Sequence, residues 1–429
     1  MKRFTILFIA VVCAVMFIAP VYADDRVNLS GEFRVRGWDI SSQNYTNNAD
    51  SSYFDQRLRM GTKINVADNV SIQLRADWGE GVWGSDYTGG GFVNDGAIVA
   101  GSAARPRKAF TNTIDVDRAF VDIKQEWWSL RAGQQYMGLG VNQVLDANAT
   151  GFKFDLNFAP VVTSVLYAKI SEDTGLIDDN DVKVDSEDQD FYALNVNYTC
   201  DAFTGNVFVA GLNDGTDTDN SPIMAGIQGS AKLGAITLLS ELDFATGDTN
   251  DGDTDYMGTQ FFLGGYADVA AGVNIGAELV YALGADPDDN EMQYSYFNKW
   301  GDTFGPMDMN TPFAGELNGY CFVDVFDPFE ILQDSSGVQG ILFQAKYSPM
   351  DIFSLGAKFA YLQPEEDIVV NTIDADASAI SCNVWMKYTI ATNTELWLTY
   401  LYTDIDVDDS LDLQLEAQKV LVSQLAIKF

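Results

Sequence analysis

The end of the chain alternates between apolar and polar side chains up to its last residue, which is aromatic. Residues 413–429 place leucine, isoleucine and phenylalanine at alternate positions, mostly with glutamine, glutamate or lysine between them. A period of two puts one set on each face of a strand, so this terminus is predicted to be a strand with one apolar face. Such a strand can belong to a soluble all-β protein or to a membrane barrel.

The beginning of the chain has the layout of a cleavable secretory signal. Lys2 and Arg3 precede an apolar run over residues 4–19, and a small-residue site ends at Ala23. Residues 1–23 are therefore predicted to be a signal peptide, and residues 24–429 a single mature domain. A final strand that closes on Phe429 resembles the signal by which bacterial outer-membrane β-barrel proteins are recognised for assembly. This combination favours the bacterial outer membrane as the location.

The spacing of the amphipathic segments gives the predicted fold. About eighteen segments alternate in polarity, each near the 9–11 residues that a tilted membrane-spanning strand requires. Every second link has only a few residues, as at 67–68 or 201–202, whereas the links between are long, as at 79–112 and 284–337. This indicates an all-β, up-and-down antiparallel transmembrane barrel with short periplasmic turns and long extracellular loops. Sixteen strands is the alternative count.

The parity within the strands predicts which face meets lipid. In residues 54–65 and 69–78, large apolar side chains alternate with arginine, lysine and aspartate. An arginine that faces lipid at the bilayer midplane costs roughly 2–4 kcal/mol, so the charged rows should face the lumen. Eighteen strands enclose more space than inward side chains fill, which favours a polar, water-filled channel over a packed interior.

Three short motifs resemble the alginate-export family of outer-membrane porins: residues 54–59, residues 117–120 and residues 131–140. The resemblance covers residues 25–140 and implies an eighteen-strand porin whose arginine-lined lumen accepts an acidic polysaccharide. The chain departs from that pattern elsewhere, because its formal charge is −37 at pH 7. Alginate itself is therefore not the expected substrate.

Eight basic residues on the first five predicted strands form the candidate pore-lining site. A row of guanidinium groups offers forked donors to carboxylate or phosphate and creates a local positive field. The competing interpretation is an ion-pair lattice without selectivity, because five carboxylates (Glu32, Asp55, Asp77, Asp117 and Asp122) share the same face. The eight candidate residues are Arg34, Arg36, Arg57, Arg59, Arg75, Arg118, Lys124 and Arg131.

The predicted function is therefore passive diffusion of small hydrophilic, anionic solutes or acidic saccharides. A general or cation-preferring porin and a closed structural or adhesive barrel are the alternatives. An enzyme is not expected, since the chain has no histidine to act as a base at neutral pH. No cofactor or metal is predicted, because the acidic loop runs do not have the spacing of a calcium loop.

The expected partners follow from the location and the charge. Outer-membrane lipid, lipopolysaccharide and small hydrophilic solutes are expected, and a homo-oligomer remains open. Nucleic acid is not, because an acidic surface repels it. The link at 284–337 is rich in aromatic residues and is predicted to be a lid or an external cap. Cys200 at a periplasmic turn and Cys321 in an external loop are too far apart for a disulfide.

Overall fold

A computed structural model describes most of the chain outside its amino terminus and several links. The described residues are 26–42, 50–83, 114–140, 144–171, 189–214, 221–248, 255–283, 291–293, 337–365, 368–370, 373–408 and 415–429. The predicted signal peptide, Cys321 and nearly all of the aromatic link lie outside these ranges. No helix in the described residues is long and apolar enough to cross a membrane.

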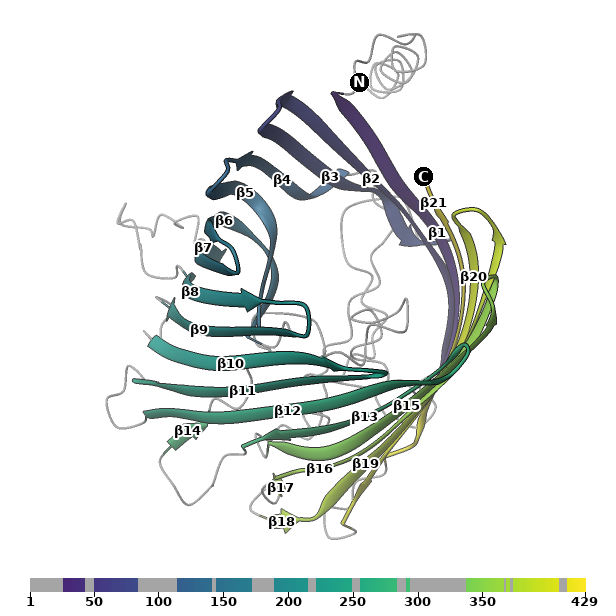
Figure 1. The fold of residues 1–429 in the computed structure, drawn as a ribbon. Coiled ribbons are helices and arrows are strands. Elements are labelled where there is room, and N and C mark those ends of the chain that lie inside the picture. The colour runs from purple at the N-terminus through teal and green to yellow at the C-terminus, as the bar shows by residue number, and fades with distance from the viewer. Residues whose placement is uncertain are drawn as a thin grey trace, which may run out of the picture.

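Eighteen long strands form the wall, and each overlaps one of the segments that polarity predicts (Figure 1). They are β1 (Val27–Ser41), β2 (Ser51–Ala67), β3 (Val70–Val82), β4 (Ile114–Lys124), β5 (Trp128–Leu139), β6 (Leu145–Phe158), β7 (Val161–Ser171), β8 (Gln189–Thr199), β9 (Phe203–Asp214), β10 (Ser221–Leu233), β11 (Ile236–Asp248), β12 (Asp255–Ala270), β13 (Val273–Ala282), β15 (Val338–Met350), β16 (Phe353–Gln363), β19 (Ala377–Ala391), β20 (Thr394–Val407) and β21 (Gln418–Lys428). Three short strands, β14 (Glu291–Gln293), β17 (Ile368–Val370) and β18 (Ile373–Ala375), lie in the links.

The sheet closes on itself because its first and last strands pair. β1 pairs antiparallel with both β2 and β21, and every other long strand pairs with its neighbours in the chain. At the seam, the backbone N–H of Gly31 donates to the carbonyl of Phe429, and Phe429 N–H donates back to Gly31. The predicted eighteen-strand antiparallel barrel is thus confirmed, with the last strand beginning at Gln418.

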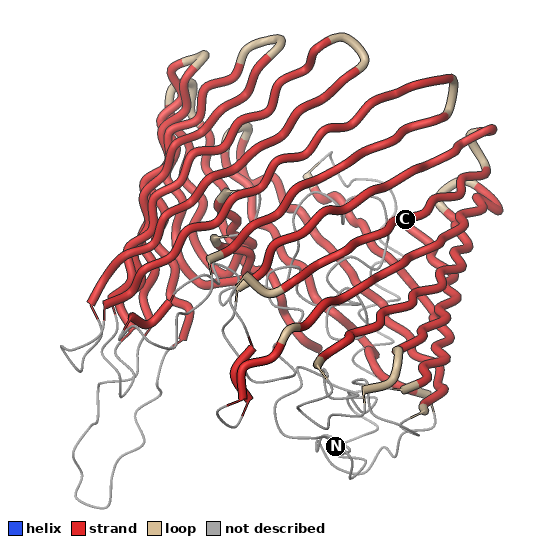
Figure 2. Tube along the Cα trace, turned by 90° about the horizontal axis from the view of Figure 1, so that it is seen from below, coloured by secondary structure: helices blue, strands red, loops and turns tan. Residues whose placement is uncertain are grey.

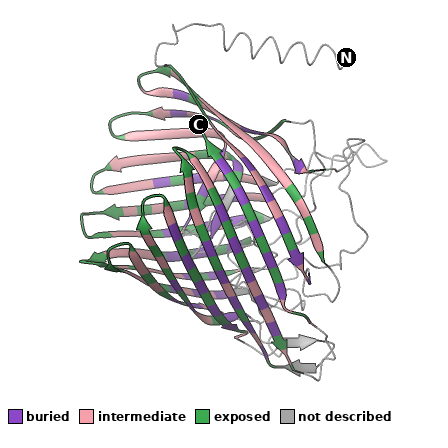
Figure 3. Cartoon of the chain, turned by 90° about the vertical axis from the view of Figure 1, so that its right-hand side faces the viewer, coloured by how far each residue is buried: buried purple, intermediate pink, exposed green. Residues whose placement is uncertain are grey.

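The two faces of the strands differ as the alternation predicts. On β2 and β3, the side chains of Phe54, Ile64, Ile72 and Leu74 are exposed on the outer face. Buried and exposed residues alternate along most of the wall, most regularly along β16 and β21 (Figure 3). An outer face of large apolar side chains is the face that a barrel turns to lipid.

Short turns connect the strands at one end of the barrel. Residues 68–69, 159–160, 234–235 and 392–393 are two-residue turns, and these turns gather at the same end (Figure 2). At the opposite end the links are longer, although those between β5 and β6, β9 and β10, and β11 and β12 have only five or six residues. The alternation of short and long links therefore agrees with the prediction.

The β5–β6 hairpin leaves the wall in its distal half. β5 pairs with β4 only as far as Gln134, and β6 pairs with β7 only from Thr150, whereas the two strands pair with each other out to Leu139 and Leu145. Of the described residues, 135–140 and 144–149 consequently lie beyond the strand pairing with β4 and β7. They form the part of the hairpin that we call the inturned hairpin.

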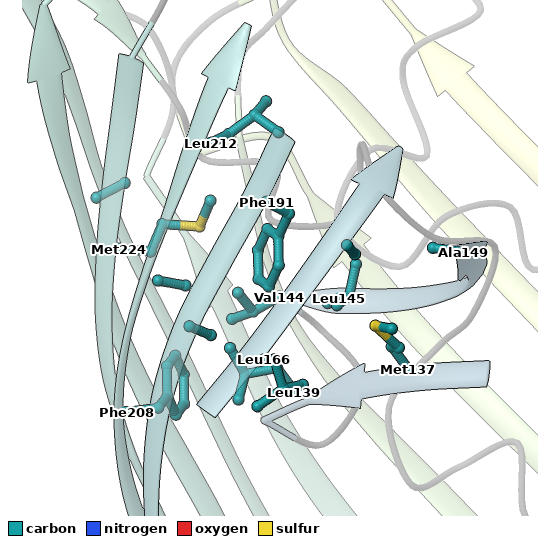
Figure 4. Close-up of a cluster of buried hydrophobic side chains, with 14 residues drawn as sticks. Met137, Leu139, Val144, Leu145, Ala149, Leu166, Phe191, Phe208, Leu212 and Met224 are labelled. Carbon is teal, nitrogen blue, oxygen red and sulfur yellow. The ribbon is translucent and has the colours of Figure 1, made fainter. Parts of the chain in front are cut away.

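The inturned hairpin packs against the inside of the wall. Met137, Leu139 and Leu145, together with Val144 in the link, contact an apolar surface contributed by β7 to β11 (Figure 4). The prediction of a polar interior is therefore wrong for this part of the lumen, where apolar residues cover one another instead of facing water. The wall residues of the cluster are Leu166, Ala168, Phe191, Ala193, Phe208, Ala210, Leu212, Met224 and Ala245.

Candidate functional site

Charged side chains gather on the inner face of β1 to β4. The strand registers place Arg36 opposite Asp55, Arg59 opposite Asp77, and Arg75 next to the irregularity in β4 that contains Asp117. Because side chains at paired positions point to the same face, the local sequence pattern brings each arginine to a carboxylate on the next strand.

Three of these arginines form close ion pairs. Arg36 Nε lies 2.9 Å from Asp55 Oδ1, and Arg36 Nη2 lies 2.8 Å from Oδ2. Arg59 reaches both oxygens of Asp77 at 2.7 Å. Arg75 Nε donates to Asp117 at 2.8 Å. Forked pairs of this kind fix the guanidinium plane and neutralise much of its charge.

The other predicted site residues on β1, β2 and β5 have different surroundings. Arg57 lies 3.5 Å from Glu32 Oε1, and the Arg131 guanidinium lies over the ring of Phe120 at 4.7 Å and 3.8 Å from an oxygen of Asp122. Arg34 is buried on β1, opposite Arg57. The strand register thus places two arginines at one pair of positions.

Lys124 is the last residue of β4, and Arg118 lies near the middle of that strand. Lys124 is near the short turns, and 68% of its side chain is exposed, with its amine 3.5 Å from Asp122. Arg118 lies next to the inturned hairpin: its guanidinium lies 5.3 Å from the centre of the Tyr136 ring, and its Nε donates to Asn148 Oδ1 at 3.4 Å. These two contacts are with an aromatic face and a neutral amide.

The inturned hairpin extends from the side of the lumen that carries the arginines to a side that carries buried carboxylates. Its tip residue Gly140 lies so close to Glu241 on β11 that a Cβ at Gly140 would overlap the carboxyl group. Glu241 and Asp243 are both buried on the inner face of β11. β11 is nine strands from β2 in a wall of eighteen, so the hairpin connects opposite sides of the lumen.

Sequence reasoning missed both the inturned hairpin and the buried carboxylates. Residues 207–212 on β9 and 223–227 on β10 are continuous apolar or small-residue runs, unlike the alternating pattern of β2. Such runs indicate strands that are buried on both faces. These runs are the sequence signal that another part of the chain covers the inner face of β9 and β10. Glu241 and Asp243 had no comparable signal among 62 acidic residues.

The cysteines that the structure describes are far from one another in the fold. Cys200 is exposed at the turn between β8 and β9, and Cys382 lies on the outer face of β19 between Ile380 and Val384.

Comparison with known proteins supports the fold and not a particular family. No protein-family model matches the chain, and no curated protein matches it. OccAB1 of Acinetobacter baumannii is similar in structure at 13% identity, with a TM-score of 0.59 over 96% of this chain and 98% of that one. OprD of Pseudomonas aeruginosa, at 10% identity, has a TM-score of 0.57 and coverages of 94% and 93%. OpdK of the same organism, solved with vanillate, is also 10% identical and has a TM-score of 0.57, over 94% of this chain and 99% of that one.

These likenesses identify the architecture. The chain has the eighteen-strand β-barrel fold of outer-membrane porins. Together with its apolar outer face, this fold places the chain in the bacterial outer membrane. The resemblance of residues 54–59, 117–120 and 131–140 to alginate-export porins stays a prediction, because no comparison with known proteins shows it.

Proposed function

We propose that the protein is a passive channel that favours small hydrophilic anions, including acidic saccharides. The observation that carries the proposal is the row of guanidinium groups on the inner face of β1 to β5, ending where Arg118 meets the inturned hairpin. A permeating anion is attracted by charges within the screening distance of about 8 Å at physiological salt.

Arg118 and Arg131 are the residues that we expect to contact the solute. Arg118 has a neutral hydrogen-bond partner and an aromatic neighbour, and Arg131 lies over Phe120 with its carboxylate partner at 3.8 Å. Guanidinium donors that are not held by a forked carboxylate can turn to a passing carboxylate. OpdK, which shares the fold, was solved with vanillate, which is a carboxylate.

A general porin is the second candidate, and the ion pairs favour it. Arg36, Arg59 and Arg75 each lie within hydrogen-bonding distance of an aspartate, so their charges are largely compensated. If neighbouring carboxylates also compensate the other arginines, the wall attracts neither sign strongly. The two candidates then differ only in selectivity.

Bilayer recordings in a salt gradient distinguish the candidates. We expect the wild type to be anion-selective or nearly unselective, and Arg118→Gln with Arg131→Gln to shift the reversal potential toward cations. The control is the double variant Arg36→Gln with Asp55→Asn, which removes an ion pair without changing the net charge and should leave the potential close to wild type. A cation-selective wild type that ignores the loss of Arg118 and Arg131 would establish the general porin.

The remaining expected partners are part of the same proposal. The apolar outer face supports contact with outer-membrane lipid, and lipopolysaccharide is the lipid that we expect at the end with the long links. A homo-oligomer is compatible with the proposal, which does not depend on it. No cofactor enters the proposed transport, and solute passage needs only the open lumen.

A further inference from the structure

The inturned hairpin leaves the wall at a pair of glycines. Gly133 of β5 lies opposite Gly151 of β6. One position farther along, β5 ends its pairing with β4 at Gln134, and β6 ends its pairing with β7 at Thr150. Both strands therefore separate from their outer neighbours at one level of the wall. We call the level of Gly133 and Gly151 the fold line.

Both glycines of the fold line are required by a neighbouring backbone. A Cβ at Gly133 would overlap the carbonyl oxygen of Ala119 on β4, and a Cβ at Gly151 would overlap that of Tyr167 on β7. Gly133 also has a φ of +123°, a conformation that L side chains rarely adopt. The sequence thus allows both strands to bend here. The two glycines do not by themselves hold the hairpin at one angle.

Gln135 is the first residue of β5 beyond its pairing with β4, and its side chain turns back across the fold line. This side chain is fully buried. Its Nε2 lies 3.2 Å from the carbonyl oxygen of Gly151 and 3.4 Å from those of Gly133 and Arg131. An amide nitrogen carries two N–H groups, so it donates to two of the three carbonyls at a time. One side chain therefore connects the two strands where they bend.

The hairpin beyond Gln135 has different contacts on its two faces. Met137 is buried against the apolar cluster of the wall. Tyr136 points the other way, and the centre of its ring lies 5.3 Å from the guanidinium of Arg118. A change of angle at the fold line would lift Met137 from the wall and move Tyr136 relative to Arg118. The angle therefore determines both the open part of the lumen and the surroundings of Arg118.

We propose that Gln135 is a positioning residue for solute passage. Its amide donors hold the inturned hairpin at a fixed angle on the fold line, so that Tyr136 stays in front of Arg118. Without these donors the hairpin lifts from the wall more often, because the glycines leave the bend free to open. The inference rests on the proposed channel, since it assigns the hairpin a place in the solute path.

Thiol labelling tests whether Gln135 holds the hairpin. In the folded mature chain without its native cysteines, Met137→Cys places a thiol under the hairpin. A small water-soluble maleimide should label this thiol slowly, and adding Gln135→Leu should make labelling at least about tenfold faster. Losing two hydrogen bonds changes an opening equilibrium by about that factor. Labelling does not depend on ion selectivity, so it tests the hinge even if the channel is a general porin.

The leucine variant separates hydrogen bonding from packing. Leucine is close to glutamine in size and suits the apolar neighbours Met137 and Leu139, so a side chain that only fills space would be replaced without effect. Labelling of Gln135→Leu at the parent rate would therefore overturn the proposal. Gln134→Leu is the matched control, because the adjacent glutamine points to the opposite face of the strand, and it should label at the parent rate.

A second variant and a second measurement keep the test decisive if Gln135→Leu does not fold. Gln135→Glu keeps the size of the side chain but presents acceptors to three carbonyls, and it should label faster than the parent. Single-channel recordings in symmetric salt, with Met137 unchanged, should show openings above the wild-type level for either folded variant. Parent-rate labelling of Gln135→Glu would overturn the proposal. So would faster labelling with wild-type conductance, because the hairpin would then lie outside the solute path.

Discussion

Single residues decide how the barrel closes. Gly31 lies on β1 where the ring of Phe429 crosses it, and a Cβ at Gly31 would lie 2.5 Å from that ring and 2.8 Å from the carbonyl oxygen of Arg59. The ring can turn away, but the backbone carbonyl cannot. The aromatic end of the chain therefore needs a glycine on the strand that it joins.

Replacing this glycine should weaken the seam. We expect Gly31→Val to lower the free energy of unfolding by about 1–3 kcal/mol, the usual cost of inserting methyl groups into a filled space. Denaturant unfolding of the refolded protein, followed by the gel mobility of the folded form, measures this. Gly211→Val on β9 is the control, since its nearest neighbour atom would be 3.9 Å from an added Cβ. Equal losses for the two variants would show that the seam is not special.

The arginines show how much of the side-chain arrangement can be predicted from the sequence. Strand parity predicted the inner face for the charged row of β2 and β3, and the structure places Arg59, Arg75 and Asp77 there. Which carboxylate each arginine meets depends on the register, and an irregularity at Asp117 shifts it in β4. A shift of one residue cannot be deduced from alternation alone.

At the scale of elements, strands and short turns were predictable and the inturned hairpin was not. The alternation of polarity predicts each strand and the face that it turns to lipid, and the length of a link predicts where a tight turn lies. The inward bend of β5 and β6 depends instead on contacts with β7 to β11, which are distant in sequence. The local motif that ends at Gly140 identifies a family resemblance without showing where the tip points.

The hairpin tip can be tested with one methyl group. Gly140 has a φ of +70°, and an added Cβ would overlap the Glu241 carboxyl group. We expect Gly140→Ala to push the tip off β11 and to raise single-channel conductance, because the hairpin then blocks less of the lumen.

The control for this variant separates backbone strain from the overlap. Gly234, in the turn between β10 and β11, has a φ of +66° with no atom near an added Cβ. Gly234→Ala carries the same left-handed strain of about 1–2 kcal/mol and should leave conductance unchanged. If both variants conduct like the wild type, the contact between Gly140 and Glu241 does not hold the hairpin in place.

At the scale of the whole molecule, the barrel follows from repetition. One amphipathic strand is compatible with many folds, whereas eighteen strands with alternating link lengths leave few arrangements other than a closed up-and-down wall. The arrangement of side chains inside the barrel could not be predicted from this repetition. Its apolar cluster joins β5 and β6 to β7 through β11, and its basic and acidic sides lie on strands nine apart in the wall. No local sequence pattern connects these strands.

The orientation in the membrane is a property of the whole barrel, and Cys200 reports on it. This thiol is exposed at the turn between β8 and β9, at the end of the barrel with the short turns. We predict that this end faces the periplasm, because long links at the other end then face outward, as in porins. In a Cys321→Ser background, a large polyethylene glycol maleimide should label Cys200 only after the outer membrane is permeabilised.

Cys382 provides the internal control in that experiment. It lies on the outer face of β19 among lipid-facing side chains, so a water-borne reagent should label it poorly before and after permeabilisation. A Cys200→Ser variant in the same background should then give no label in either condition. Labelling of Cys200 in intact cells would reverse the barrel, place the long links in the periplasm, and require solutes to meet the short-turn rim, near Lys124, before Arg118 and the inturned hairpin.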